Sequence, residues 1–187
     1  MSTAPLPQPP SRSRYSLGSL PNMMRSLLVI AALVAIVIVI VPRSEQIRQP
    51  AVDAAAKAAW TAKESGWPIE SPVGLAPGWQ ATTATYAPAT DSVVTYTAVY
   101  QSPDGQFITL REAKGPTQNW LDETLDGAES EGLMPIGSRT WESWHQSEKK
   151  RYALVQRSAL TLVVTGSGSA QDVAEFASLL ARVTPAS

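Results

Sequence analysis

An unbroken apolar run near the N-terminus constrains this chain more than any other feature. Residues 27–41 read LLVIAALVAIVIVIV, fifteen apolar side chains without a polar interruption. A helix on the surface of a soluble protein needs a polar face, and this run has none. With the residues just before it, the hydrophobic stretch covers 23–41, close to the roughly 20 residues that cross a hydrocarbon core as a helix. The sequence therefore predicts one transmembrane helix over 23–41, with the lipid bilayer as its partner. The residues that mark its length are Met23, Leu27, Leu33 and Val41.

A cleaved signal peptide is the main alternative to a permanent anchor. Cleavage needs small residues shortly after the apolar run, whereas PRSEQ follows at 42–46 and the first alanine triplet comes only at 54–56. A buried core strand or helix is a second alternative, which the uniform hydrophobicity disfavours.

Charge around the run bears on its orientation. Three basic residues precede it and a similar number follow it closely, so the positive-inside bias is nearly balanced. A short tail ahead of a first apolar segment still favours a cytoplasmic N-terminus. We therefore expect a single-pass protein of the cell membrane with an extracytoplasmic C-terminal domain.

Composition excludes several classes of protein. All 16 acidic residues lie after Val41, so the C-terminal part is mildly acidic and has no basic stripe for nucleic acid. Cysteine is absent, which excludes disulfides, thiolate metal sites and cysteine nucleophiles. The first 22 residues are rich in proline, serine and arginine, which predicts a disordered cytoplasmic tail.

Beyond the anchor the pattern predicts a juxtamembrane helix and linker over 42–78, then one α+β domain over 79–187. Alanine-rich 51–65 ends at Gly66, a residue suited to a helix C-cap. The turn at 102–105, SPDG, joins two β-rich segments into a hairpin. We expect an antiparallel sheet of about five or six strands with helices packed on one face. The last helix begins with a Ser-x-x-Asp capping box at Ser169 and continues through Val183.

The chemistry-bearing residues form no convincing active site, so we expect no catalytic residues, no cofactor and no metal. His145 is the single histidine, and strand alternation places Glu142 on the opposite side from it. Five carboxylates crowd 122–131, but their spacing matches no calcium loop. GSGS at 166–169 has only part of a phosphate-binding pattern, and helix capping explains it better.

Two tryptophans are candidates for an interaction surface. Trp141 and Trp144 lie in one predicted strand and point to opposite faces. At least one of them should therefore be accessible, where an indole often anchors an interface.

Several segments together resemble a known family. They are RSLLVIAALVAIVIVIVPR, LAPGWQATTATYAP, SPDGQFITLREAKGP with NWLDE, GSRTWE and TLVVTGSGSAQDVAEFASLL. In this order they resemble the actinobacterial domain-of-unknown-function 4245 family, from Arg25 onward. The resemblance implies a single-pass membrane protein with an extracytoplasmic domain, and it implies no activity.

We therefore expect a membrane-anchored interaction module of the cell envelope without catalytic activity, whose partner is an envelope protein or ligand and not nucleic acid. The alternative is a small-molecule or lipid-binding extracytoplasmic domain, which requires a cavity of a few hundred Å3. A hydrolase that uses His145 is a third hypothesis.

Overall fold

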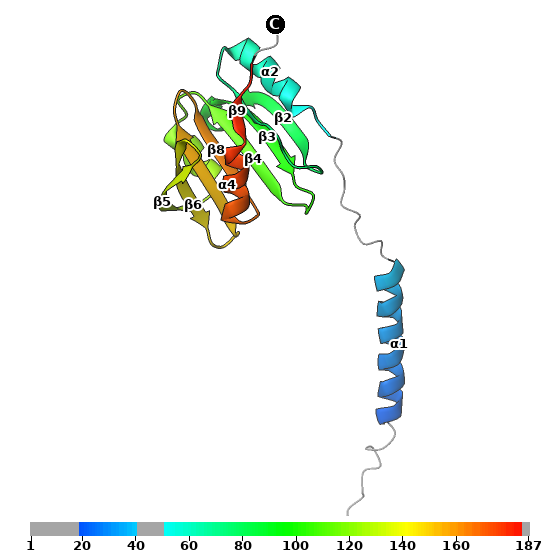
Figure 1. Cartoon of the computed structure of the whole chain (residues 1–187). Helices are drawn as coiled ribbons and strands as arrows, with labels where there is room; N and C mark the ends of the chain where they lie inside the picture. Colours follow the sequence, from blue (N-terminus) through cyan, green and yellow to red (C-terminus); the bar gives the residue numbers. More distant parts are fainter. Residues whose placement is uncertain (1–18, 41–50, 185–187) are drawn as a thin grey trace, which may run out of the picture. The chain divides into compact units, whose positions relative to one another are not determined.

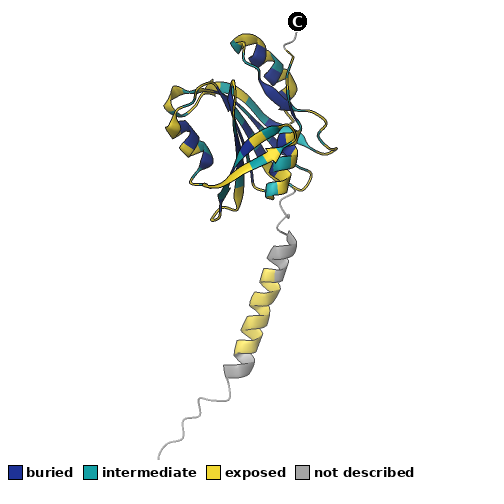
Figure 2. Ribbon diagram, turned by 60° about the vertical axis from the view of Figure 1, so that its left-hand side comes forward, coloured by how far each residue is buried: buried dark blue, intermediate teal, exposed yellow. Residues whose placement is uncertain are grey.

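The computed structural model describes residues 19–40 and 51–184, which belong to two compact units, Met1–Ile47 and Arg48–Ser187 (Figure 1). The first unit contains helix α1 (Ser19–Ile40). Its side chains are described over 23–34, where the large apolar ones, Met23, Leu27 and Leu33 among them, are exposed (Figure 2). Within the described parts of the chain, no helix combines the length and hydropathy that crossing a membrane requires.

Helix α1 begins before the predicted start of the apolar span. Pro21 is compatible with this start, because the first helical turn has backbone N–H groups without intrahelical partners. The predicted disordered tail over 1–22 therefore overlaps the helix, and residues 1–18 lie outside the described residues. Val41 and the side chains of 35–40, which belong to the predicted span, also lie outside them.

The second unit is built on a seven-stranded antiparallel sheet in the order β2-β3-β4-β8-β7-β6-β5. Its strands are two meanders that meet at the central pair β4 and β8. The bounds are β2 Gln80–Pro88, β3 Val94–Gln101, β4 Phe107–Ala113, β5 Glu129–Ile136, β6 Arg139–Gln146, β7 Arg151–Arg157 and β8 Thr161–Gly166. A 3-10 turn, η1 (Thr90–Ser92), separates β2 from β3. The predicted α+β class and the predicted hairpin at 102–105 are confirmed.

The sheet has more strands than the predicted five or six, and β5 is the strand that sequence patterning missed. Its sequence ESEGLMPI contains Gly132 and Pro135, both depleted in strands, and most of its side chains are exposed. As an edge strand, β5 leaves one row of backbone N–H groups unpaired in the sheet, which is the setting that tolerates proline (Figure 1). The register with β6 also shifts between Ser130 and Gly132.

Helices cover both faces of the sheet, so the prediction of helices on one face is wrong. Helices α2 (Ala54–Ser65) and α4 (Ala170–Ser178) pack on one face, around a core that includes Leu110, Leu162 and Val164. Helix α3 (Gln118–Leu125) packs on the other face. Its core contains Trp120, Leu121 and Leu125 with Val155 and Val163. Neighbouring residues such as Leu162 and Val163 enter opposite cores because strand side chains alternate.

A second, two-stranded sheet pairs the first strand of the domain with its last described strand. Strand β1 (Glu70–Pro72) pairs antiparallel with β9 (Leu180–Arg182). Because α2 and β1 pack into this unit, the domain begins well before residue 79, and the predicted linker over 42–78 belongs largely to it. The last helix ends at Ser178 rather than continuing through Val183 as predicted, and the chain continues directly into β9.

Glu112 connects this small sheet to the large one. The side chain is fully buried, and both of its carboxylate oxygens accept the backbone N–H of Glu70, at 3.0 and 3.1 Å. Burial raises the pKa of Glu112 well above its usual value of 4.5. Arg139 adds a second link, since its guanidinium donates to the Glu70 carboxylate at 2.6 Å.

Candidate functional site

A cavity of about 390 Å3 lies on the α4 face of the domain. Three segments that are distant in sequence surround it: the loop before β2, the turn between β3 and β4, and the α4 region. Its apolar floor consists of Leu75, Trp79, Ile108, Phe176 and Leu179, and its acidic residues are Asp104, Asp172 and Glu175. Other lining residues are Gly74, Ala76, Ser102, Pro103, Gln106 and Gly168. We call this space the α4 cavity.

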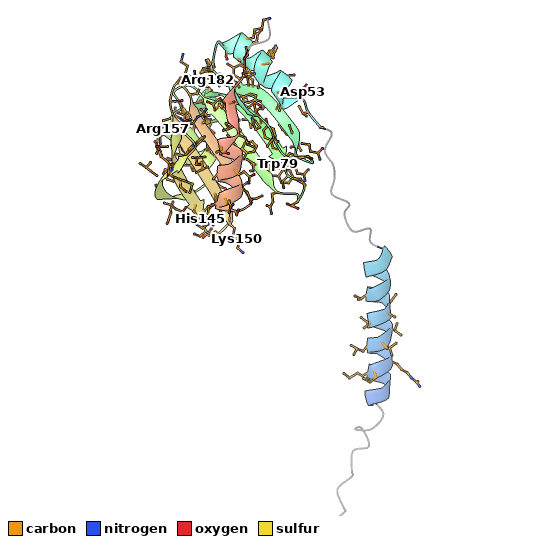
Figure 3. The ribbon with its side chains drawn as sticks, viewed as in Figure 1. Asp53, Trp79, His145, Lys150, Arg157 and Arg182 are labelled. Atoms are coloured by element: carbon orange, nitrogen blue, oxygen red, sulfur yellow. The ribbon has the colours of Figure 1, made fainter. Side chains whose placement is uncertain are left out.

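Aromatic contacts hold the floor of the α4 cavity. The ring of Phe176 lies 5.9 Å from that of Trp79 and 5.2 Å from that of Tyr100, measured between centroids. Trp79 precedes β2 and lies beside the helical layer of this face (Figure 3). Tyr100 is buried, and that burial raises the pKa of its hydroxyl. The floor is therefore apolar and fixed by packing.

Glycines allow the walls to approach closely. A Cβ at Gly78 would lie 2.9 Å from Cγ of Pro103, so the loop before β2 packs directly on the hairpin turn. A Cβ at Gly166 would lie 2.5 Å from Cγ2 of Val173, so the end of β8 touches α4. Side chains at these positions would separate the segments that form the cavity.

The start of α4 is fixed by the predicted capping box, which the structure confirms. The Ser169 hydroxyl accepts the Asp172 backbone N–H at 3.2 Å, and the Asp172 carboxylate accepts the Ser169 backbone N–H at 2.7 Å. The Ser169 hydroxyl is also 2.8 Å from the same carboxylate oxygen. The segment GSGS at 166–169 therefore leads into α4 and ends at its N-cap, Ser169.

The acidic residues of the α4 cavity have no cationic partner in the described part of the chain. No Lys, Arg or His lines the cavity, and none of the ion pairs of the domain involves Asp104, Asp172 or Glu175. The Asp172 carboxylate is occupied by Ser169, whereas Asp104 and Glu175 are exposed. The cavity thus joins an apolar floor to an excess of negative charge.

His145 lies in a different cluster, on β6. Its ring stacks on that of Tyr152 at 4.4 Å between centroids, and its Nδ1 is 3.5 Å from Oε1 of Glu131. Glu131 comes from the missed strand β5, which is why sequence reasoning did not find it. Glu142 binds Arg157 instead.

The geometry of this cluster does not activate a nucleophile. The Ser143 hydroxyl donates to Oε2 of Glu131 at 3.2 Å, and within the described residues it has no hydrogen bond to His145. Nucleophilic catalysis by serine needs a base in hydrogen-bond reach of the hydroxyl. Ser143 and His145 instead both contact the carboxylate of Glu131.

The two predicted interface tryptophans differ in exposure. Trp141 is 0% exposed and belongs to the α4-side core, so it cannot anchor a partner, and its place in the predicted interaction surface is wrong. Trp144 is half-buried against the α3-side core, and its Nε1 has no hydrogen-bond partner within the domain. Of the pair, only Trp144 is left as a candidate surface residue.

The carboxylates of 122–131 do not converge. Asp126 binds Lys149 at 2.6 Å, and this hydrogen bond lowers the pKa of Asp126. Glu123 accepts the hydroxyl of Thr90, and Glu131 faces Ser143. Across residues 19–40 and 51–184, no group of three acidic or histidine side chains is placed to hold a metal ion.

The fold and the α4 cavity define a class: a small α+β domain with two helix-covered sheet faces and a ligand-sized cavity on one of them. The model of the family "Protein of unknown function (DUF4245)" matches residues 16–180, and the chain belongs to this family. A comparison with curated proteins found no match.

Proposed function

We propose that this protein is a membrane-anchored extracytoplasmic module of the cell envelope, which binds a small molecule in the α4 cavity and performs no reaction on it. The cavity is the observation that carries the proposal. Its volume of about 390 Å3 falls within the range of roughly 300–1,000 Å3 that is usual for ligand sites, and its floor is apolar. The sequence favours a protein-binding module first and a small-molecule domain second, and the cavity favours the second.

The proposed anchor rests on the apolar run at 27–41 and its extension to Met23. A helix over 23–41 rises about 28 Å, close to the roughly 30 Å of a hydrocarbon core. Large apolar side chains described within α1 are exposed, as a lipid-facing surface requires. The proposal places the domain outside the cytoplasm, and this orientation is part of what the experiments must test.

The anchor can be tested by a charge substitution with a matched control. Leu33→Lys places a charge at the centre of the run, at a cost of about 2.5–3.5 kcal/mol for insertion. Leu133→Lys introduces the same change at an exposed leucine of β5. We expect alkaline extraction to release more of the Leu33→Lys protein than of wild type or Leu133→Lys. Wild-type protein that stays in the aqueous supernatant without detergent would contradict the anchor.

Ligand binding can be tested by thermal shift with the full-length protein in detergent. A ligand that binds only the folded state raises the free energy of unfolding by about 2.7 kcal/mol at a hundredfold excess over its Kd. Ala76→Trp should fill the cavity and abolish the shift, whereas Ala159→Trp, at an exposed loop position, should not. A compound library without stabilising hits, or hits that persist in Ala76→Trp, would refute the proposal.

A protein partner is the second candidate function, and an exposed aromatic group on α2 favours it. Trp60 is 46% exposed, and its ring lies 6.3 Å from that of Tyr86. Lys57 Nζ lies 3.7 Å from the Trp60 ring centroid, and the Trp67 ring lies 5.7 Å from that of Tyr86. Crosslinking in membranes should recover a reproducible partner that Trp60→Ala loses and Phe107→Ala, a change at another exposed aromatic residue, retains. Equal recovery from both variants would exclude this surface.

A further inference from the structure

We propose that the ligand of the α4 cavity is a small organic cation, with an apolar body and one protonated amine. This inference rests on the proposed binding function and adds the chemical class of the ligand. It assigns the apolar floor to the body of the molecule and the acidic residues to its amine.

The charge of the lining selects against anions. Three carboxylates line the cavity, and among the described residues no Lys, Arg or His joins them. A carboxylate or phosphate ligand would therefore meet only like charge, which is repulsive at close range. A ligand with an ammonium group would meet complementary charge at the same positions.

Two of the three carboxylates are available to such an amine. Asp172 already accepts the backbone N–H and faces the hydroxyl of Ser169, so its role is to cap α4. Asp104 lies in the hairpin turn, Glu175 lies one turn along α4, and neither has an ion-pair partner in the described structure. They belong to two separate segments of the cavity wall, the β3–β4 turn and α4, so an amine bound in the cavity would be attracted by both.

The floor suits the rest of an amphiphilic cation. Trp79 and Phe176 offer aromatic surface, and Leu75, Ile108 and Leu179 add aliphatic surface. An apolar body of a ligand would be removed from water there. The indole ring of Trp79 can also attract a cation through its π electrons. An anion would gain no such attraction. A neutral apolar molecule would fill the floor but leave both carboxylates unengaged.

The test compares three probes of one shape on the full-length protein in detergent: 4-phenylbutylammonium, 4-phenylbutanol and 4-phenylbutyrate. Binding is measured by calorimetry and by the fluorescence change of Trp79, with Trp79→Phe as the reference for that signal. We expect the ammonium probe to bind about threefold to tenfold more tightly than the alcohol, and the carboxylate not to bind. Raising the salt concentration should weaken the ammonium probe only.

Paired variants identify the charges responsible. Asp104→Asn with Glu175→Gln should reduce the affinity for the ammonium probe to that for the alcohol and leave the alcohol unchanged. Glu64→Gln with Glu148→Gln, a double change at exposed carboxylates outside the cavity, should leave all three probes unchanged.

The possible outcomes distinguish the cationic ligand from the proposed binding function on which it rests. Equal binding of ammonium and alcohol, lost in Ala76→Trp, would overturn the cationic ligand while supporting a binding cavity. Tighter binding of the carboxylate would overturn the inference in the same way. If none of the three probes binds and the wider compound library also gives no hit, the binding function itself fails.

Discussion

The backbone N–H of Glu70 is bound by both carboxylate oxygens of Glu112, at 3.0 and 3.1 Å, in the interior of the domain. Glu112 lies on β4 in the centre of the large sheet, and Glu70 lies on β1 of the small sheet. A single buried side chain therefore joins the two sheets. Its neighbours include the hydroxyl groups of Tyr96 and Tyr100 and the Arg139 guanidinium, which contacts Glu70.

Glu112 should make the stability of the domain depend on pH. Because burial raises the pKa of Glu112, the folded state retains a proton that the unfolded chain releases near its usual pKa of 4.5. Stability from this group is fully present below that value and declines as pH rises towards the folded pKa. In urea unfolding, Glu112→Gln should flatten this decline, which begins as pH rises above 4.5. An exposed change, Glu148→Gln, should not, and an unchanged slope in Glu112→Gln would contradict the assignment.

Arg139 should contribute more to stability than a similar arginine nearby. Arg139→Ala leaves the buried carboxylate of Glu70 without its 2.6 Å partner, and we expect a loss of about 1.5–3 kcal/mol. Arg157→Ala removes a more exposed contact with Glu142 and should cost less than about 1 kcal/mol. Denaturant midpoints of the two variants measure the difference. Equal losses would mean that burial of the Glu70 pair has no energetic consequence.

Gly166→Ala should push α4 away from β8. The new Cβ would meet Cγ2 of Val173 at 2.5 Å, so we expect a loss of about 1–3 kcal/mol from overpacking. Removing the obstructing methyl groups with Val173→Ala should recover part of this loss in the double variant. A double-mutant cycle by thermal unfolding measures that coupling. Additive losses would show that the close contact is relieved elsewhere.

Two tryptophans whose indole Nε1 atoms are both buried should respond differently to the same substitution. Trp120 Nε1 donates to the Thr95 hydroxyl at 3.0 Å, whereas Trp144 Nε1 is buried without a partner in the domain. Trp120→Phe loses this hydrogen bond, although the Thr95 hydroxyl still donates to the Val93 carbonyl, so it should cost about 1 kcal/mol more than Trp144→Phe. Urea unfolding of both variants is the measurement. A larger loss from Trp144→Phe would indicate an undetected partner for its indole.

Local signals in the sequence predicted the central elements well. The turn at 102–105 and the Ser169 capping box each act within a few residues, and each is present in the structure. The edge strand β5 was not predicted, because Gly132 and Pro135 are unfavourable in strands. A position at the sheet edge makes both residues tolerable there. Leu180 is apolar at a helical spacing from Phe176, but it is buried as the first residue of β9. Its burial was predictable, whereas its secondary structure was not.

The α4 cavity could not be predicted from any single segment. Trp79 and Phe176 are far apart in the sequence, and only the packing of α4 on the sheet brings their rings together. Asp104 reads as an ordinary turn residue, and Glu175 as an ordinary exposed helix residue. The glycine-serine run at 166–169 was the one local signal near the site, and its capping role explained it fully.

The pairing of β1 with β9 also has a consequence for the order of synthesis. A ribosome makes Glu70 more than a hundred residues before Arg182, yet the two residues are partners in one ladder. Until the last segment emerges, the nascent domain has an unfinished edge, and Leu180 cannot enter the core. The domain therefore closes only after β9 has been translated, and a chain cut before Leu180 should leave it open.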